Sequence, residues 1–230
     1  MGWLQAAFCG LVASTWLWAD VSNPFLPNQD RTLGTQLPEV HFTDDQGKPF
    51  LLSDLRGKPL LVSPVFATCK FTCTPITQNL KNALPANWKL GTDYEILTLS
   101  FDPDDGVEKM SALRKRANLP PEWKLAIGNP DEVRKMLQTL DFRYLTMEQD
   151  GFSHSNFIAA VDKEQRIRYY LLGTNRTPDE VARALEAAAG SSQWKEYARI
   201  GFVFFSLSGL IFSSVYFVKL LPKALRRRPA

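Results

Sequence analysis

Two cysteines four positions apart, Cys69 and Cys73, and a histidine, His154, are the residues whose types point to chemistry in this 230-residue chain. Two thiolates and an imidazole form a ligand set that suits copper. Two thiols at short spacing also suit thiol–disulfide exchange, and in an exported protein they suit a structural disulfide. If the turn is helix-like, the Cβ atoms lie roughly 5–6 Å apart, a spacing that permits a bridging metal or a disulfide.

The segments around these residues predict an α/β domain. Short apolar runs indicate strands, a polar turn between two of them indicates a β-hairpin, and proline-bearing caps with helical spacing of apolar residues indicate helices. The predicted strands are 40–43, 50–52, 60–66, 95–101, 157–161 and 166–172, and the predicted helices begin near Thr74, Val107, Asn129 and Thr177. This order predicts a thioredoxin-like fold with an N-terminal β-hairpin.

The predicted fold places Cys69, Cys73 and His154 close to one another. Cys69 follows a predicted strand and Cys73 lies at a helix start, where backbone N–H groups and the helix dipole favour a thiolate. His154 lies in the loop before the strand at 157–161, and in a thioredoxin-like fold that loop lies against the cysteine turn. We therefore expect His154 to complete a Cys₂His site. The other histidine, His41, alternates with apolar residues in the hairpin and is expected to be exposed.

From residue 37 to 189 the chain resembles the Sco/SenC copper proteins of cytochrome oxidase assembly. The resemblance rests on Cys69-x-x-x-Cys73, on the Ser-x-Asp-Pro element that ends at Asp102-Pro103, on the segment 52–58 and on His154-Ser155. It implies that Cys69, Cys73 and His154 bind one copper ion, as Cu(I), Cu(II) or both. It also implies a role in building the copper A centre, with the copper A-bearing oxidase subunit or another copper chaperone as partner.

The chain departs from the family pattern beside each ligand. The family usually has proline after each cysteine, where this chain has Lys70 and Thr74, and Ser153 stands where an acidic residue often precedes the histidine. The ligand set itself is retained. Asp102 has two alternative roles, an electrostatic residue beside the site or an aspartate that starts a turn before proline.

Three functional hypotheses remain open from the sequence. The first is a membrane-anchored copper chaperone. The second is a thiol–disulfide oxidoreductase that uses Cys69 and Cys73 to keep the copper-ligand cysteines of the oxidase reduced, although it gives no role to His154. The third is a scaffold stapled by a disulfide, but so short a loop constrains little chain entropy.

The two ends of the chain predict export and anchoring. Residues 1–19 are uncharged and apolar and predict a signal peptide or an N-terminal anchor. Residues 20–35 predict a linker, 36–190 the thioredoxin-like Sco domain and 191–199 a second linker. Residues 200–218 lack charges and predict a C-terminal transmembrane helix, followed by a basic cytoplasmic tail at 219–230.

Charge gives the expected orientation. The chain has a net charge of +3, of which the tail contributes five positive charges, so the rest is at −2. The positive-inside rule therefore predicts a bacterial-type inner membrane protein with a single C-terminal span, membrane lipid around it, and its soluble domain on the periplasmic side. No nucleic-acid partner is expected.

Overall fold

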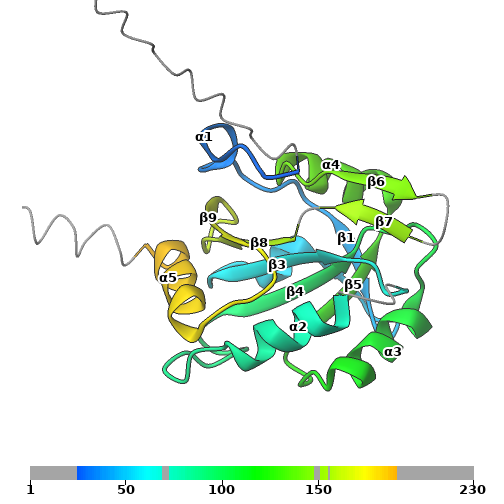
Figure 1. Ribbon diagram of the computed structural model, residues 1–230, viewed down its shortest axis with the longest axis horizontal. Helices are drawn as coiled ribbons and strands as arrows, with labels where there is room; N and C mark the ends of the chain where they lie inside the picture. The colour runs from blue at the N-terminus through cyan, green and yellow to red at the C-terminus, as the bar shows by residue number, and fades with distance from the viewer. Residues whose placement is uncertain (1–24, 69–72, 148–150, 155, 191–230) are drawn as a thin grey trace, which may run out of the picture.

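A seven-stranded mixed sheet forms the centre of the protein (Figure 1). The structure is a computed structural model that describes residues 25–68, 73–147, 151–154 and 156–190, and of Cys73 it describes the backbone. The strands run in the order β2-β1-β5-β4-β3-β8-β9. In chain order they are β1 (His41–Asp44), β2 (Pro49–Leu51), β3 (Leu60–Val65), β4 (Glu95–Ser100), β5 (Lys124–Gly128), β8 (Phe157–Val161) and β9 (Ile167–Leu172).

Helices cover both faces of this sheet. In chain order they are α1 (Gln29–Thr32), the 3₁₀ turn η1 (Leu52–Leu55), α2 (Cys73–Asn82), α3 (Val107–Ala117), α4 (Pro130–Thr139) and α5 (Pro178–Ala188). In Figure 1, α2 and α3 lie below the sheet and α4 lies above it. Two of the predicted caps are confirmed: Asn129 accepts a hydrogen bond at the start of α4, and Thr177 forms a capping box with Glu180 at the start of α5. The third prediction is wrong by one residue, since α2 begins at Cys73 and Thr74 lies within the helix.

Four strands and two helices give the predicted thioredoxin-like connectivity. Strand β3 is parallel to β4 and antiparallel to β8, and β9 is antiparallel to β8. Helix α2 connects β3 to β4, and α5 follows β9 and packs on β8 and β9. The predicted N-terminal hairpin is confirmed, with His41 paired to Leu51, and β1 extends the sheet by pairing with β5.

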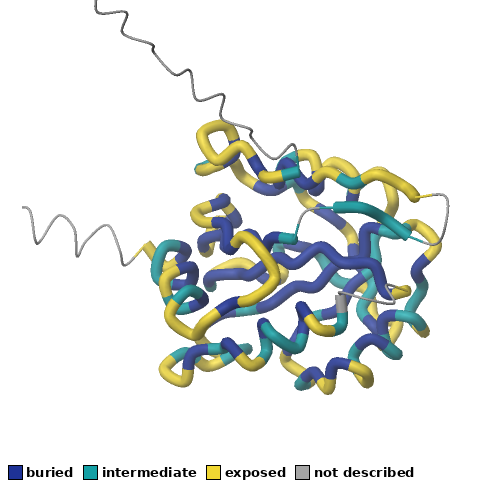
Figure 2. The backbone as a smooth tube through the Cα atoms, viewed as in Figure 1, coloured by how far each residue is buried: buried dark blue, intermediate teal, exposed yellow. Residues whose placement is uncertain are grey.

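Strand β3 is buried along its whole length and β4 is buried from Ile96 onward, as Figure 2 shows. A parallel strand covered on both faces has no exposed side, which explains why these segments are continuous apolar runs rather than alternating ones. Where α4 packs on the end of β5 the approach is close. A Cβ on Gly128 would lie 2.8 Å from Val133 Cγ2, so any other residue here would have to displace the Val133 side chain.

Strand β5 was not predicted. Its sequence, Lys-Leu-Ala-Ile-Gly, buries only Leu125 and Ala126 completely, and so short a run lacks a clear period. Pairing with a strand on each side, parallel to β4 and antiparallel to β1, stabilises it in the structure.

The short helix α1 lies within residues 20–35, where the sequence predicted a linker. Asn28 caps it by accepting a hydrogen bond from the Arg31 N–H. Asp141, beyond α4, accepts hydrogen bonds from the Asn28 N–H at 2.8 Å and from Arg31 Nη2 at 2.6 Å. A contact between segments more than a hundred residues apart therefore holds α1 in place.

Within the part of the chain that the structure describes, no helix is both long and apolar enough to cross a membrane. The predicted signal peptide or anchor at 1–19, the linker at 191–199, the transmembrane helix at 200–218 and the tail at 219–230 lie outside the described residues.

Candidate metal centre

Of the three predicted ligands, the structure describes His154 and the backbone of Cys73. Cys73 is the first residue of α2, which directly follows the segment after β3. Cys69 lies outside the described residues. His154 is the last residue of β7 (Gly151–His154). Among the side chains that the structure describes, no three His, Cys, Asp or Glu residues cluster closely enough to hold a metal, and neither cysteine side chain is among them.

The prediction that His154 lies in a loop is wrong. It lies in a two-stranded hairpin of β6 (Tyr144–Met147) and β7, and it pairs with Tyr144. The hairpin projects from the same side of the sheet as α4 (Figure 1). Because β7 is four residues long and mixes glycine, serine and histidine with one phenylalanine, it carries no apolar run by which the sequence could reveal it.

Aromatic rings surround the His154 imidazole. Its ring centroid lies 5.2 Å from that of Phe101, 5.5 Å from Phe142 and 5.9 Å from Phe66. Phe152 makes edge contacts with Phe66 and Phe101 at 5.2 Å each. Aromatic packing of this kind favours particular ring orientations, so these rings help to orient the half-buried imidazole.

These ring contacts bring His154 to the base of the segment that carries the cysteines. Phe66 is three residues before Cys69, and three Cα–Cα steps of 3.8 Å reach at most about 11 Å. The first turn of α2 contains no acidic residue, so nothing there opposes the effect of the helix N-terminus on a thiolate at Cys73. Two soft thiolates and an imidazole in an apolar shell fit copper by donor type and surroundings.

The turn-forming role predicted as one of two for Asp102 is confirmed. Its Oδ1 accepts a hydrogen bond from the Asp104 N–H at 3.0 Å, and the residue is half-buried. The buried carboxylate of this stretch belongs instead to Asp105, whose side chain is fully buried. The sequence contains three aspartates within four residues and offers no sign of which one points inward.

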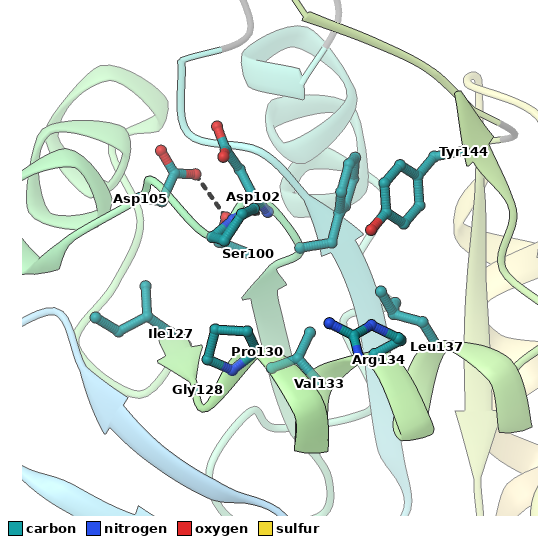
Figure 3. A pocket seen from close by; sticks show the side chains of 12 residues that line it. Ser100, Asp102, Asp105, Ile127, Gly128, Pro130, Val133, Arg134, Leu137 and Tyr144 are labelled. Carbon is teal, nitrogen blue, oxygen red and sulfur yellow. Dashed lines mark hydrogen bonds between the residues drawn. The ribbon is translucent and has the colours of Figure 1, made fainter. Parts of the chain in front are cut away.

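A partly open cavity of about 260 Å³ adjoins the His154 side of the site (Figure 3). The ends of β4 and β5 and the first turns of α4 form its walls, and Phe101 and Tyr144 border both this cavity and the aromatic cluster around His154. Asp102 and Arg134 carry opposite charges on its rim.

His41 is separate from this site, and its predicted exposure is confirmed: its side chain is 72% exposed. Its Nδ1 lies 3.2 Å from Glu132 Oε1. The Glu132 carboxylate also accepts a hydrogen bond from the His41 backbone N–H at 2.7 Å, and this bond, followed by the imidazole, lowers the pKa of Glu132 below its usual value.

The connectivity and the position of Cys73 at the start of the first core helix define a protein of the thioredoxin-like class. Comparison with known proteins then identifies the family: the SCO1/SenC family model matches residues 31–190. The chain belongs to the SCO1/SenC family, and the family resemblance predicted from the sequence is confirmed.

Solved structures share the fold of this chain. A protein from Aquifex aeolicus VF5 that is assigned to electron transfer is 32% identical, with a TM-score of 0.66 over 69% of this chain and 95% of that chain. Arabidopsis thaliana ScoI with copper bound is 19% identical, with a TM-score of 0.57 over 66% and 99%. BsSco, a Sco-family cytochrome c oxidase assembly protein with a disulfide switch, is 21% identical, with a TM-score of 0.58 over 68% and 95%.

Proposed function

We propose that this protein binds one copper ion through Cys69, Cys73 and His154 and serves as a copper chaperone in assembly of the copper A centre of cytochrome c oxidase. The observation that carries the proposal is the packing of His154 against Phe66, at the base of the cysteine-bearing segment. Family membership supports it, and ScoI from Arabidopsis thaliana has a structure with copper bound.

Each residue has a distinct role in this proposal. Cys69 and Cys73 supply soft thiolates, which retain Cu(I), and His154 supplies a third donor that also suits Cu(II). A site with three protein ligands leaves room for a ligand from the acceptor to bind before the ion leaves. We propose the copper A-bearing subunit or another copper chaperone as the exchange partner.

The cellular setting is also proposed from the sequence. Residues 200–218 would anchor the protein in the lipid of a bacterial-type inner membrane, with the basic tail in the cytoplasm. The domain of residues 36–190 would then lie on the periplasmic side.

Thiol–disulfide exchange is the second candidate function, because a cysteine begins the first core helix of a thioredoxin-like fold and BsSco has a disulfide switch. One thiolate of the Cys69–Cys73 pair would attack a disulfide in the partner and form a mixed disulfide, which the second thiol resolves. The partner gains two thiols, and this chain loses two electrons and two protons as it forms its own disulfide. A dithiol reductant on the same side of the membrane must then regenerate it.

Copper(I) competition separates the two candidates. The full chain in detergent, reduced and free of oxygen, is titrated with copper(I) against bicinchoninate. We expect one copper per chain, and at least roughly tenfold weaker binding for His154→Ala, since even loss of a partner outside the ligand set costs 10–100-fold. The control is His41→Ala, which removes the chain's other, exposed histidine and is expected to bind as the wild type does.

A different result would favour exchange over copper transfer. If His154→Ala binds copper as tightly as the wild type while the copper-free protein reduces an acceptor disulfide, the copper-chaperone proposal fails and the oxidoreductase stands.

A further inference from the structure

Both hydrogen-bonding groups of the Ala67 backbone, two residues before Cys69, are held by side chains at the two ends of α3, one of them just before the helix. The Ala67 N–H donates to Asp105 Oδ2 at 2.6 Å. The Ala67 carbonyl accepts a hydrogen bond from Arg116 Nη2 at 2.7 Å. Asp105 lies just before α3 and Arg116 in its last turn. The two ends of one helix therefore fix the peptide groups on either side of Ala67.

The Asp105 carboxylate is buried and hydrogen-bonded in the protein interior. Its side chain is fully buried, and the same Oδ2 accepts a second hydrogen bond from Ser100 Oγ at 2.5 Å (Figure 3). Lys109 Nζ, one turn into α3, lies 3.4 Å from Oδ1. Burying a carboxylate costs free energy unless it is paired and hydrogen-bonded. One of the Asp105 hydrogen bonds comes from the Ala67 N–H, in the backbone that leads to Cys69.

Helix α3 also holds α2, the helix that begins at Cys73. Gln78 Nε2 donates to the Arg116 carbonyl at 3.1 Å. Lys81 Nζ donates to the carbonyls of Ala117 and Asn118 at 3.3 and 3.1 Å. The end of α3 thus holds the chain before and after residues 69–72, at Ala67 and on α2.

We propose that Asp105 is a positioning residue: together with Arg116 it fixes Ala67, where the chain enters the segment that carries Cys69 and Cys73. The inference rests on the proposed function in one respect, that these two thiols act together. A fixed backbone at Ala67 lowers the entropy lost when the thiols close a disulfide or bind an ion. The carboxylate acts through geometry, as a hydrogen-bond acceptor.

Asparagine and alanine at position 105 separate geometry from charge. Asp105→Asn keeps an oxygen that can accept from Ala67 and Ser100 and removes the charge, whereas Asp105→Ala removes the acceptor. Arg116→Ala releases the other side of Ala67 and, because Arg116 is exposed, is expected to fold normally. Asp104→Ala, at an exposed neighbouring carboxylate, is the matched control.

Two readouts on the copper-free full chain in detergent test the proposal: amide hydrogen exchange of Ala67, and the dithiol–disulfide equilibrium against glutathione. For Asp105→Ala and Arg116→Ala we expect Ala67 to exchange roughly tenfold faster or more, since freeing one backbone residue is worth about a tenfold change. The disulfide should become roughly tenfold easier to reduce, which is about 30 mV for a two-electron couple. Asp105→Asn and Asp104→Ala should stay close to the wild type.

The outcomes are distinct. If Asp105→Asn matches Asp105→Ala in both readouts, charge and not position is responsible, and the proposal is overturned. It is also overturned if Arg116→Ala leaves both readouts at wild-type values. Failure of the wild type to bind copper, with both readouts as expected, would reject the copper function and leave the positioning role intact.

Discussion

Replacing Cys69 or Cys73 by serine is expected to weaken copper(I) binding by a thousandfold or more, a loss on the order of 4 kcal/mol. A serine hydroxyl is a poor ligand for a soft ion, and the remaining thiolate and imidazole leave the ion with two donors. The measurement is the same anaerobic competition with bicinchoninate, made on the full chain.

The control for this pair is Cys9→Ser, which removes the remaining cysteine of the chain. Cys9 lies in the predicted signal peptide or anchor, so its loss should leave the affinity unchanged. If either Cys69→Ser or Cys73→Ser keeps its affinity within tenfold of the wild type, that cysteine is no ligand and the proposed site is incorrect.

Replacing Arg114 by methionine is expected to lower the free energy of unfolding by about 3 to 5 kcal/mol, because it leaves a buried carboxylate without its partner. Arg114 Nε lies 2.5 Å from Asp45 Oδ2 and Nη2 lies 2.8 Å from Asp45 Oδ1. The Asp45 side chain is 4% exposed. The same guanidinium donates to the carbonyls of Pro120 and Trp123. Denaturant unfolding of the wild type and the variant measures the loss.

A matched surface pair gives the control. Arg134 Nη1 lies 2.8 Å from Asp131 Oδ1, but these side chains are 60% and 75% exposed. Arg134→Met should therefore cost no more than about 1 kcal/mol. Similar small losses for Arg114→Met and Arg134→Met would show that burial of the Asp45 pair does not matter. Arg114 also fixes α3 against the β1–β2 turn, so its loss should loosen the helix that holds Ala67.

Much of the fold could be predicted because its signals are local. The apolar runs of β3 and β4, the polar turn of the first hairpin and the caps at Asn129 and Thr177 are each contained within a few residues. Strand β5 and helix α1 were missed because pairing partners distant in the sequence stabilise them.

For the site too, the local features could be predicted from the sequence and the tertiary contacts could not. The types and spacing of Cys69, Cys73 and His154 are visible in the sequence, as is the place of the cysteines between a strand and a helix. The β6–β7 hairpin and the rings around His154 are not visible there. Phe66 follows β3, Phe101 follows β4 and Phe142 follows α4, and only the tertiary fold brings the three rings to His154. In the sequence, nothing distinguishes these phenylalanines from ordinary core residues.

The central claim is that one copper ion is bound by both cysteines and His154 together. Copper K-edge X-ray absorption of the copper(I)-loaded full chain tests it most directly, with His154→Ala measured beside the wild type. We expect two sulfur neighbours and one imidazole nitrogen in the wild type, and two sulfurs without that imidazole in the variant. A single sulfur neighbour in the wild type, or an imidazole signal that persists in His154→Ala, would contradict the claim.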